Sequence, residues 1–319
     1  MTIIDVSVKD WIRGKKFVVT GGAGFIGHHL VRTLLENEAQ HITVIDDLSF
    51  GSEDFIPKNN RITFINFSIG KNDTEILRPY INKDTYVFHL AAQKHRAGER
   101  DHAAVWRSNV TGWDELLQLC GEQCVPQVIF TSSLYAYGKL FDQPMQETMQ
   151  PAPHTAYGIS KLAGEHLLKM YSTNFGFNHQ IARLFFVYGP EQYYKSEYSS
   201  VIHKNIERIR AGQSPIVNGS GKQTLDYIYI DDVVRALLKL AQCNINGTLA
   251  NIATGKGWSI LDIIKKISQI LKKEVEIDFA PADWTDHTNR VGNFYHINQI
   301  CNWSPEIDFE IGLKHCIEE

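Results

Sequence analysis

The chain has 319 residues, of which 43% are hydrophobic and 21% charged, and its formal net charge is -4. This composition is ordinary for a soluble globular protein, and the length suits one large domain or two moderate ones. A slightly acidic balance with no run of Lys or Arg argues against nucleic acid or an anionic membrane as a main partner. No apolar run approaches the roughly 20 residues that span a bilayer, and the first residues lack a signal-peptide pattern. We therefore expect a cytoplasmic protein.

The cysteines and histidines do not show the spacing of metal ligands. The five cysteines form no CxxC motif, and the thirteen histidines form no HExxH motif. Cys120 and Cys124 are four residues apart in a predicted helix, so we expect them to pack rather than to bind metal. The sequence therefore predicts neither a disulfide framework nor a metal site.

Short apolar runs alternate with helical patterns along the first part of the chain. Strands are predicted over 17–20, 41–46, 61–67, 85–91, 127–133 and 179–189, and helices over 26–37, 101–122 and 156–173. Nearly all-apolar strands that alternate with helices indicate a parallel sheet covered on both faces. We predict an α/β protein with a Rossmann doubly wound domain over 1–186. A smaller substrate-binding α/β part over 187–319 would return some segments to the sheet.

A glycine-rich turn follows the first predicted strand. In FVVTGGAGFIGHHL, Gly21 permits a tight turn, Gly24 allows a pyrophosphate to approach the backbone, and Gly27 allows helix and strand to pack closely. The helix N-terminus then offers N–H groups to phosphates. Asp46 ends the second strand, where a carboxylate binds ribose hydroxyls and repels a 2′-phosphate. No Lys or Arg follows until Lys58, so the pattern favours NAD over NADP.

Two Tyr-x-x-x-Lys pairs occur, and about one is expected by chance. Tyr135 and Lys139 flank a glycine in a predicted loop, where this spacing does not place two side chains together. Tyr157 and Lys161 open a helical pattern, in which residues i and i+4 are neighbours. A lysine there can lower the pKa of a phenol that normally ionises near pH 10. We take Tyr157 and Lys161 as catalytic.

With these motifs, the chain resembles an extended short-chain dehydrogenase/reductase of the NAD-dependent nucleotide-sugar epimerase/dehydratase family. The resemblance covers residues 17 to about 240, through TGGAGFIG, IDDLSFG, HLAAQK, SNV, SSLYAYG, YGISK, RLFFVYGP and TLDYIYIDDVVRA. It implies that NAD takes a hydride from a sugar carbon, usually C4, while the tyrosine takes the hydroxyl proton. It also implies a homodimer whose interface is built from the helices near 101–122 and 156–173, although their apolar faces are equally consistent with core packing.

The resemblance assigns further residues to the site. Ser133 takes the position of the catalytic hydroxyl that shares the tyrosine's hydrogen bond. The implied cofactor-binding residues are Gly21, Gly24, Phe25, Ile26, Gly27, Asp46, Asp47, Ser49, Ser68, Ile69, Leu90, Ala91, Ala92, Lys94, Asn109, Tyr157 and Lys161. The implied substrate-binding residues are Lys94, Ser133, Phe186, Lys195, Lys204 and Arg290.

Departures from the family pattern bear on the reaction and on the substrate. Members that eliminate water carry Asp-Glu directly after the catalytic hydroxyl, whereas this chain has Leu134 and Tyr135, which cannot exchange a proton near pH 7 as a carboxyl does. The acidic residue that contacts adenine is Ser68 here. The Asn and Arg that bind the substrate diphosphate are Phe186 and Leu225. Either these are neutral replacements, or Lys195, Lys204 and Arg290 hold the diphosphate, or the substrate is unusual.

The leading hypothesis is therefore an NAD-dependent nucleotide-sugar 4-epimerase. The alternative is a 4-dehydrogenase that releases the 4-keto sugar. A third possibility is a protein that binds a dinucleotide without catalysis, and the intact Ser133, Tyr157 and Lys161 argue against it.

Overall fold

Seven parallel strands form the central sheet of the protein, which we describe from a computed structural model covering residues 2, 4–94, 101–138, 144–192, 200–282, 286 and 288–318. The spatial order is β11-β6-β5-β4-β1-β2-β3. The strands are β1 (Lys16–Thr20), β2 (His41–Asp46), β3 (Ile62–Asn66), β4 (Thr85–His89), β5 (Gln127–Ser133), β6 (Asn178–Leu184) and β11 (Thr248–Ile252).

The central strands are apolar because both faces of the sheet are covered. Every residue of β5 is buried, and Val18 and Val19 of β1 are completely inaccessible. The strand order reverses direction between β1 and β4, since β1 pairs with β2 on one side and with β4 on the other. In open α/β sheets, such a reversal opens a crevice at the carboxyl ends of the strands. The predicted doubly wound α/β fold is confirmed.

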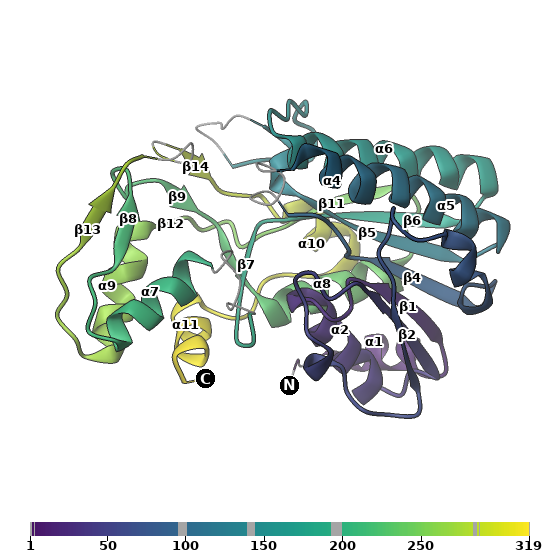
Figure 1. The fold of residues 1–319 in the computed structure, drawn as a ribbon, viewed down its shortest axis with the longest axis horizontal. Helices are drawn as coiled ribbons and strands as arrows, with labels where there is room; N and C mark the ends of the chain where they lie inside the picture. Colours follow the sequence, from purple (N-terminus) through teal and green to yellow (C-terminus); the bar gives the residue numbers. More distant parts are fainter. Residues whose placement is uncertain are drawn as a thin grey trace.

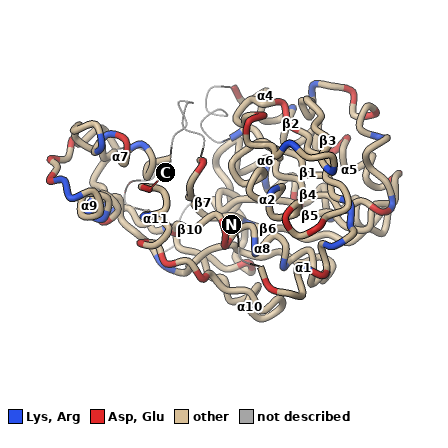
Figure 2. Tube along the Cα trace, turned by 90° about the horizontal axis from the view of Figure 1, so that it is seen from below, with Lys and Arg blue, Asp and Glu red and all other residues tan. Residues whose placement is uncertain are grey.

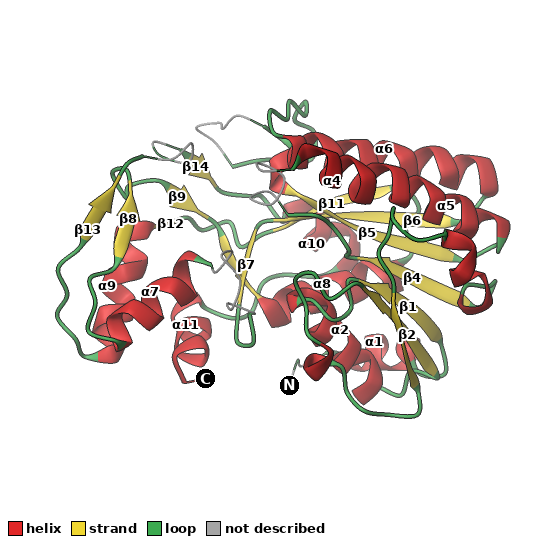
Figure 3. Cartoon of the chain, in the orientation of Figure 1, coloured by secondary structure: helices red, strands yellow, loops and turns green. Residues whose placement is uncertain are grey.

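Helices form a layer on each face of the sheet (Figure 3). One layer contains α4 (His102–Trp106), α5 (Gly112–Glu122) and α6 (Ala156–Phe175), and α6 contacts β5 and β6. The other contains α2 (Phe25–Glu36) on β1 and β2, α8 (Ile230–Cys243) on β5 and β6, and also α1 (Val6–Ile12) and α10 (Tyr295–Cys301). Short helical turns occupy Glu53–Phe55, Thr74–Tyr80 and Leu134–Ala136. The helix predicted over 101–122 is present, and a π-helical turn at Arg107–Thr111 lies between its two α-helical parts, α4 and α5.

The second half of the molecule is built from short strands in three small sheets (Figure 1). β7 (Phe186–Tyr188) pairs with β10 (Tyr227–Tyr229), β8 (Ile216–Asn218) with β13 (Asp278–Ala280), and β9 (Thr224–Leu225) with both β12 (Trp258–Ser259) and β14 (Asn289–Arg290). The helices α7 (Val201–Arg210), α9 (Ile260–Leu271) and α11 (Phe309–Glu318) complete this half. The chain also returns from it to the central sheet, because β11 pairs with β6. The division into 1–186 and 187–319 stays a prediction.

Residues of opposite charge are mixed along the chain. In the view of Figure 2, Lys and Arg are interspersed with Asp and Glu. No helix in the described part of the chain has the length and apolar character that crossing a membrane requires. Cys120 packs in the core as predicted, but the same prediction was wrong for Cys124, which lies after the end of α5 and is exposed.

Candidate active site

A cavity of about 810 Å³ extends from the carboxyl ends of the central strands to the second half of the molecule. This volume is near the upper end of what small-molecule sites usually enclose. The first half contributes the glycine turn and the ends of β2, β4 and β5, whereas the second contributes β7, α7, β8 and β9. Most of the predicted site residues line it: Gly21, Gly24, Phe25, Ile26, Gly27, Asp46, Asp47, Ile69, Leu90, Ala91, Ala92, Lys94, Ser133, Tyr157, Phe186 and Lys204.

The turn between β1 and α2 has a backbone conformation and close contacts that only glycine allows at positions 21 and 27. Gly21 has a φ of +70°, which residues with a Cβ rarely adopt, and a Cβ there would lie 2.7 Å from the backbone nitrogen of Ala91. At Gly27 a Cβ would lie 2.1 Å from the carbonyl oxygen of Gly21, so this glycine allows α2 to approach the turn. Gly24 is the N-cap of α2 and lines the cavity. The first-turn N–H groups of a helix have no intrahelical partner, so this wall suits a pyrophosphate.

Two aspartates define the far end of this wall. Asp46 accepts hydrogen bonds from the backbone N–H groups of Ala23 (3.0 Å) and Leu48 (2.8 Å), which fix its carboxylate at the cavity. Burial raises the pKa of Asp46 above its ordinary value. Asp47 accepts a bond of 2.7 Å from the hydroxyl of Ser68 and one of 3.0 Å from the backbone of Ser49. Ser49 and Ser68 do not line the cavity themselves, so the structure connects them to it through Asp47.

The segment after β4 forms the facing wall. The ammonium of Lys94 lies 5.1 Å from the ring centroid of Phe50, and the Asp46 carboxylate opposes the lowering of its pKa by desolvation. A basic residue therefore does approach Asp46, but it comes from the segment after β4 rather than from the segment after β2. The opposite wall, which begins at the glycine turn, still carries the two carboxylates of Asp46 and Asp47.

Asn109 stands behind this wall. Its side chain accepts a bond of 2.7 Å from the backbone nitrogen of Gln93 and donates to the Gln93 carbonyl (3.1 Å) and to the hydroxyl of Ser160 (3.0 Å). Ser160 in turn donates to the carbonyl of Tyr157. Asn109 does not line the cavity, so the geometry gives it a positioning role between the β4 loop and α6, and direct contact with a cofactor stays a prediction.

Ser133, Tyr157 and Lys161 meet at the end of β5. A side-chain hydrogen bond joins the hydroxyls of Ser133 and Tyr157. Thr155 caps α6 by accepting a bond from the backbone of Gly158, and this fixes where the helix begins and where Tyr157 points. The Lys161 ammonium donates to the carbonyl oxygen of Thr131 (2.9 Å) and lies 5.9 Å from the Tyr157 ring centroid. Tyr157 and Lys161 are therefore neighbours on α6, as their spacing predicts, whereas the catalytic role of the pair stays a prediction.

Burial shifts both titratable groups of this constellation. It raises the pKa of Tyr157 to about 12, although the bond with Ser133 acts in the opposite direction. Burial lowers the pKa of Lys161 to about 7. Perturbed pKa values of this kind, beside a cavity, are typical of functional sites. For Tyr157 to act as a base near neutral pH, positive charge has to be added when the site is loaded.

A buried ion pair holds α6 against the strands. Glu165 accepts bonds from Arg183 of β6 at 2.8 and 2.7 Å and from the hydroxyl of Ser132 at 2.5 Å. The Arg183 guanidinium also lies 4.4 Å from the ring centroid of Tyr137. Tyr137 in turn donates to Asn251 of β11 (2.7 Å). These contacts fix the strand and helix that carry the catalytic hydroxyls.

The predicted substrate residues are divided between the cavity and its surroundings. Phe186 and Leu225 line the wall formed by β7 and β9, so the wall is apolar at these two positions. Lys204 of α7 is exposed and lines the same region. Arg290 is completely buried behind it, with its guanidinium 5.6 Å from the ring centroid of Tyr135. Lys195 and Lys139 lie outside the described residues.

Several lining residues were missed from the sequence. Tyr135 packs edge-on against Tyr157, with 5.6 Å between ring centroids. Tyr227 and the polar side chains of Asn205, Asn218 and Gln223 also line the cavity. Of these residues, only Tyr135 could have been expected at the site from the sequence, because it lies two residues after Ser133. The others come from short elements with no local motif.

The glycine turn, the carboxylates after β2 and the hydroxyl–lysine constellation together define a dinucleotide-binding enzyme of the short-chain dehydrogenase/reductase type. The model of the NAD dependent epimerase/dehydratase family matches residues 17–253, and this chain belongs to that family.

Similar proteins extend this likeness over almost the whole chain. A protein of Methanocaldococcus jannaschii described as a putative UDP-glucose 4-epimerase is 34% identical over 94% of this chain and 96% of its own length. The structure of UDP-glucose 4-epimerase from Thermotoga maritima with UDP-glucose has a TM-score of 0.87 and 32% identity, covering 95% of this chain and 97% of that one. The structure of UDP-glucuronic acid 4-epimerase from Bacillus cereus with UDP-glucuronic acid and NAD has a TM-score of 0.86 and 29% identity, covering 95% and 98%. The predicted family, enzyme class and NAD dependence are confirmed.

Proposed function

We propose that this protein is an NAD-dependent 4-epimerase of a uridine diphosphate sugar. The observation that carries the proposal is the single cavity that joins the glycine turn of the first half, the Ser133–Tyr157 pair and the polar side chains of α7 and β8. A dinucleotide would lie along the glycine turn at one end of this cavity, and the nucleotide sugar would lie against the residues of α7 and β8 at the other. The uridine diphosphate group is proposed because the UDP-glucose and UDP-glucuronic acid 4-epimerases share this fold over nearly their full length.

The residues of the glycine turn fit NAD, because Gly21 and Gly27 have no space for a Cβ and Gly24 opens α2 to the cavity. When bound, NAD supplies the hydride acceptor. We assign the proton of the sugar C4 hydroxyl to Tyr157 and the orientation of that hydroxyl to Ser133. The ammonium of Lys161, 5.9 Å from the Tyr157 ring centroid, favours the phenolate. Epimerisation would be completed if the hydride returned to the opposite face of C4 and Tyr157 gave its proton back to the C4 oxygen.

Elimination of water is disfavoured by the residues after Ser133. Leu134 is buried and Tyr135 lines the cavity, so neither position supplies a carboxyl as acid or base. A specific observation supports a second candidate, a 4-dehydrogenase that releases the keto sugar. Phe186 and Leu225 make part of the substrate wall apolar, and weaker binding of the diphosphate would favour release before the hydride returns.

One assay separates these reactions. The purified protein is incubated with UDP-glucose, UDP-glucuronic acid or UDP-N-acetylglucosamine, and the products are read by NMR while absorbance at about 340 nm follows NADH. Inverted C4 without lasting NADH is expected. Stoichiometric NADH with a 4-keto sugar would instead establish the dehydrogenase, and protein that binds NAD but turns over none of these sugars would refute the epimerase proposal for them.

The substrate-binding residues are tested by charge removal. Lys204→Met should raise the KM for the UDP sugar about tenfold, because a charge-assisted hydrogen bond contributes about 1.5–3 kcal/mol, while NAD affinity stays unchanged. Lys222→Met is the matched control, since Lys222 is exposed and does not line the cavity. An equal effect of the two variants would remove Lys204 from the site.

A homodimer and a cytoplasmic location complete the proposal. Ile159 and Met170 of α6 are 41% and 46% exposed, and their spacing of eleven residues places them on one face of the helix. Trp106 of α4 is exposed in the same layer. Light scattering should give the mass of two chains, and Met170→Asp should shift it toward one; a monomeric wild type would refute the dimer. The cytoplasmic location is supported by NAD and nucleotide sugars, which are metabolites of the cell interior.

A further inference from the structure

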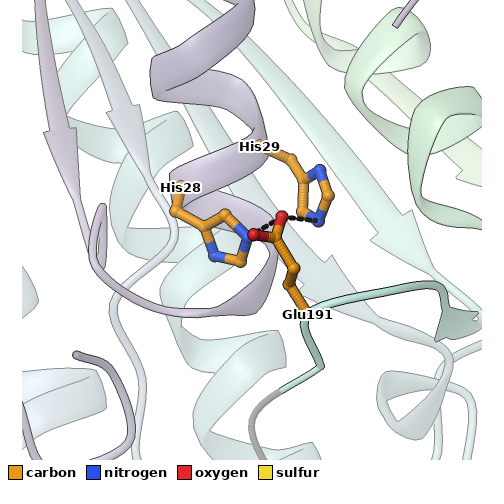
Figure 4. A group of neighbouring side chains, drawn as sticks. All are labelled: His28, His29 and Glu191. Atoms are coloured by element: carbon orange, nitrogen blue, oxygen red, sulfur yellow. Dashed lines mark ion pairs between the residues drawn. The ribbon is translucent and has the colours of Figure 1, made fainter. Parts of the chain in front are cut away.

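Three side chains from two distant parts of the sequence meet beside the cofactor cavity. His28 and His29 lie near the start of α2, and Glu191 follows β7 (Figure 4). Both imidazoles turn toward the same carboxylate oxygen: Oε2 of Glu191 lies 3.4 Å from Nε2 of His28 and 3.9 Å from Nε2 of His29. One potential ligand atom from each of the three lies within 4.8 Å of the others.

The hydrogen bonds of His28 show which ring nitrogen carries the hydrogen and which one keeps its lone pair. Its Nδ1 lies 2.9 Å from the carbonyl oxygen of Gly24, which can only accept, so Nδ1 carries the hydrogen of the neutral ring. The side chain is completely buried and stacked on Phe55, with 4.5 Å between ring centroids. Among the described residues, Nε2 makes no hydrogen bond. A buried nitrogen that carries a lone pair therefore lies 3.4 Å from a carboxylate oxygen without a hydrogen bond between them.

The distance between these atoms indicates what can lie between them. An N–H···O bond normally measures 2.7–3.2 Å, so 3.4 Å is long for a shared proton. Two ligands of a tetrahedral metal ion, each bonded at about 2.0–2.1 Å, lie about 3.3 Å apart. The Nδ1–H bond to a backbone carbonyl is also the contact that metal-binding histidines usually make with their second nitrogen.

The remaining contacts of the cluster are compatible with a bound ion. Arg32, one turn further along α2, donates through NH2 to Oε1 of Glu191 (2.8 Å), and its NH1 contacts Oε2. This guanidinium limits the affinity for a cation but orients the carboxylate, as hydrogen bonds to metal-binding carboxylates commonly do. Nε2 of His29 lies 3.3 Å from the carbonyl of Pro190. His29 becomes a ligand when its proton moves to Nδ1.

We propose that His28, His29 and Glu191 form a binding site for one divalent transition-metal ion, with water completing the coordination. Two imidazole nitrogens and one carboxylate suit Zn²⁺ or Co²⁺ rather than Mg²⁺ or Ca²⁺, which prefer oxygen ligands. The ion would join the helix whose first residues line the cofactor cavity to the segment after β7, where Gln192 also lines it. Its role is to fix this contact, since none of the three ligands belongs to the Ser133–Tyr157–Lys161 constellation.

The test uses full-length protein without a histidine tag, first stripped of metal with a chelator. Titration with Co²⁺ should give one equivalent of binding with visible absorption of a four- or five-coordinate site, and Zn²⁺ should displace it. His29→Gln and Glu191→Gln should each weaken Zn²⁺ binding at least about tenfold. His166→Ala, which removes an exposed histidine of α6, is the matched control and should bind as the wild type does.

A second measurement keeps the test independent of enzyme activity. Zn²⁺ should raise the Tm of the wild type and of His166→Ala but not that of Glu191→Gln. Both test variants replace partly exposed side chains, so folding is expected and is checked by circular dichroism. The proposal is overturned if the wild type binds no Co²⁺ stoichiometrically, or if Glu191→Gln binds as tightly as the control. The cluster would then be no more than the Arg32–Glu191 ion pair packed against two neutral histidines.

Discussion

Replacing Lys161 by Met should make the cofactor-free protein more stable at low pH. In the folded state, burial lowers the pKa of this lysine from 10.5 to about 7. Because one pKa unit corresponds to about 1.36 kcal/mol, the buried lysine costs the folded state up to about 5 kcal/mol at pH 6. Met has a similar length and carries no charge, so this cost disappears in the variant.

A second effect acts in the opposite direction. The variant loses the hydrogen bond from the ammonium to the carbonyl oxygen of Thr131 and leaves that buried acceptor unsatisfied, which costs about 1–3 kcal/mol. The desolvation effect is larger at pH 6, so Lys161→Met should exceed the wild type in free energy of unfolding by about 2–4 kcal/mol.

The stability difference between the wild type and the variant changes with pH. Between pH 7 and 10.5 the unfolded chain retains the lysine proton while the folded chain has lost it, so the stability of the wild type rises with pH. From pH 6 to 9.5 the wild type should gain about 3 kcal/mol relative to the variant, which removes the advantage of the variant or reverses it. Urea unfolding of NAD-free protein at both pH values measures this, with Lys169→Met, exposed on the same helix, as the control. A variant that is less stable at pH 6, or a difference that does not change with pH, would refute the reasoning.

Three further substitutions test the remaining parts of the site. Gly27→Ala should cost about 1–3 kcal/mol or more and weaken NAD binding, because the new Cβ would lie 2.1 Å from the carbonyl oxygen of Gly21; unchanged NAD affinity by fluorescence titration would contradict this. Asp46→Ala should weaken NAD more than NADP, since it removes the carboxylate that disfavours a 2′-phosphate; an unchanged preference in paired titrations would remove that argument. Glu165→Ala should cost about 3–5 kcal/mol in urea unfolding, because it leaves the Arg183 guanidinium buried without its carboxylate; a loss below about 1 kcal/mol would show that water reaches the pair.

The strands and the motifs that were predicted from residues close together in the sequence agree with the structure. The six predicted strands correspond to β1–β6, with β7 continuing the last prediction, because long apolar runs between helices have one stable arrangement in a covered parallel sheet. The glycine turn and the Tyr157–Lys161 spacing were also readable, since each depends on residues close together in the chain. β11 could not be assigned to the sheet in this way, because it joins β6 after a long excursion through the second half.

The substrate side and the histidine cluster could not be derived from the sequence in the same way. Strands of two or three residues such as β9 have no hydrophobic period, and β9 pairs with β14 about 65 residues later. Asn205 lines the cavity because of where α7 packs, which no motif records. Glu191 and His28 are far apart in the sequence, so the spacing of residues along the chain could not indicate that they meet.

The position of Glu165 on α6 has a consequence for how the enzyme can vary. Tyr157, Lys161 and Glu165 are four residues apart in succession, so they form one stripe about 12 Å long on a single face of the helix. The helix therefore fixes the distance between the hydroxyl of Tyr157 and the carboxylate of Glu165 that pairs with Arg183. An insertion or deletion of one residue between positions 157 and 165 would turn the two by about 100° relative to each other. Variation in this segment should therefore be confined to substitutions, and the face opposite the stripe is where they are tolerated.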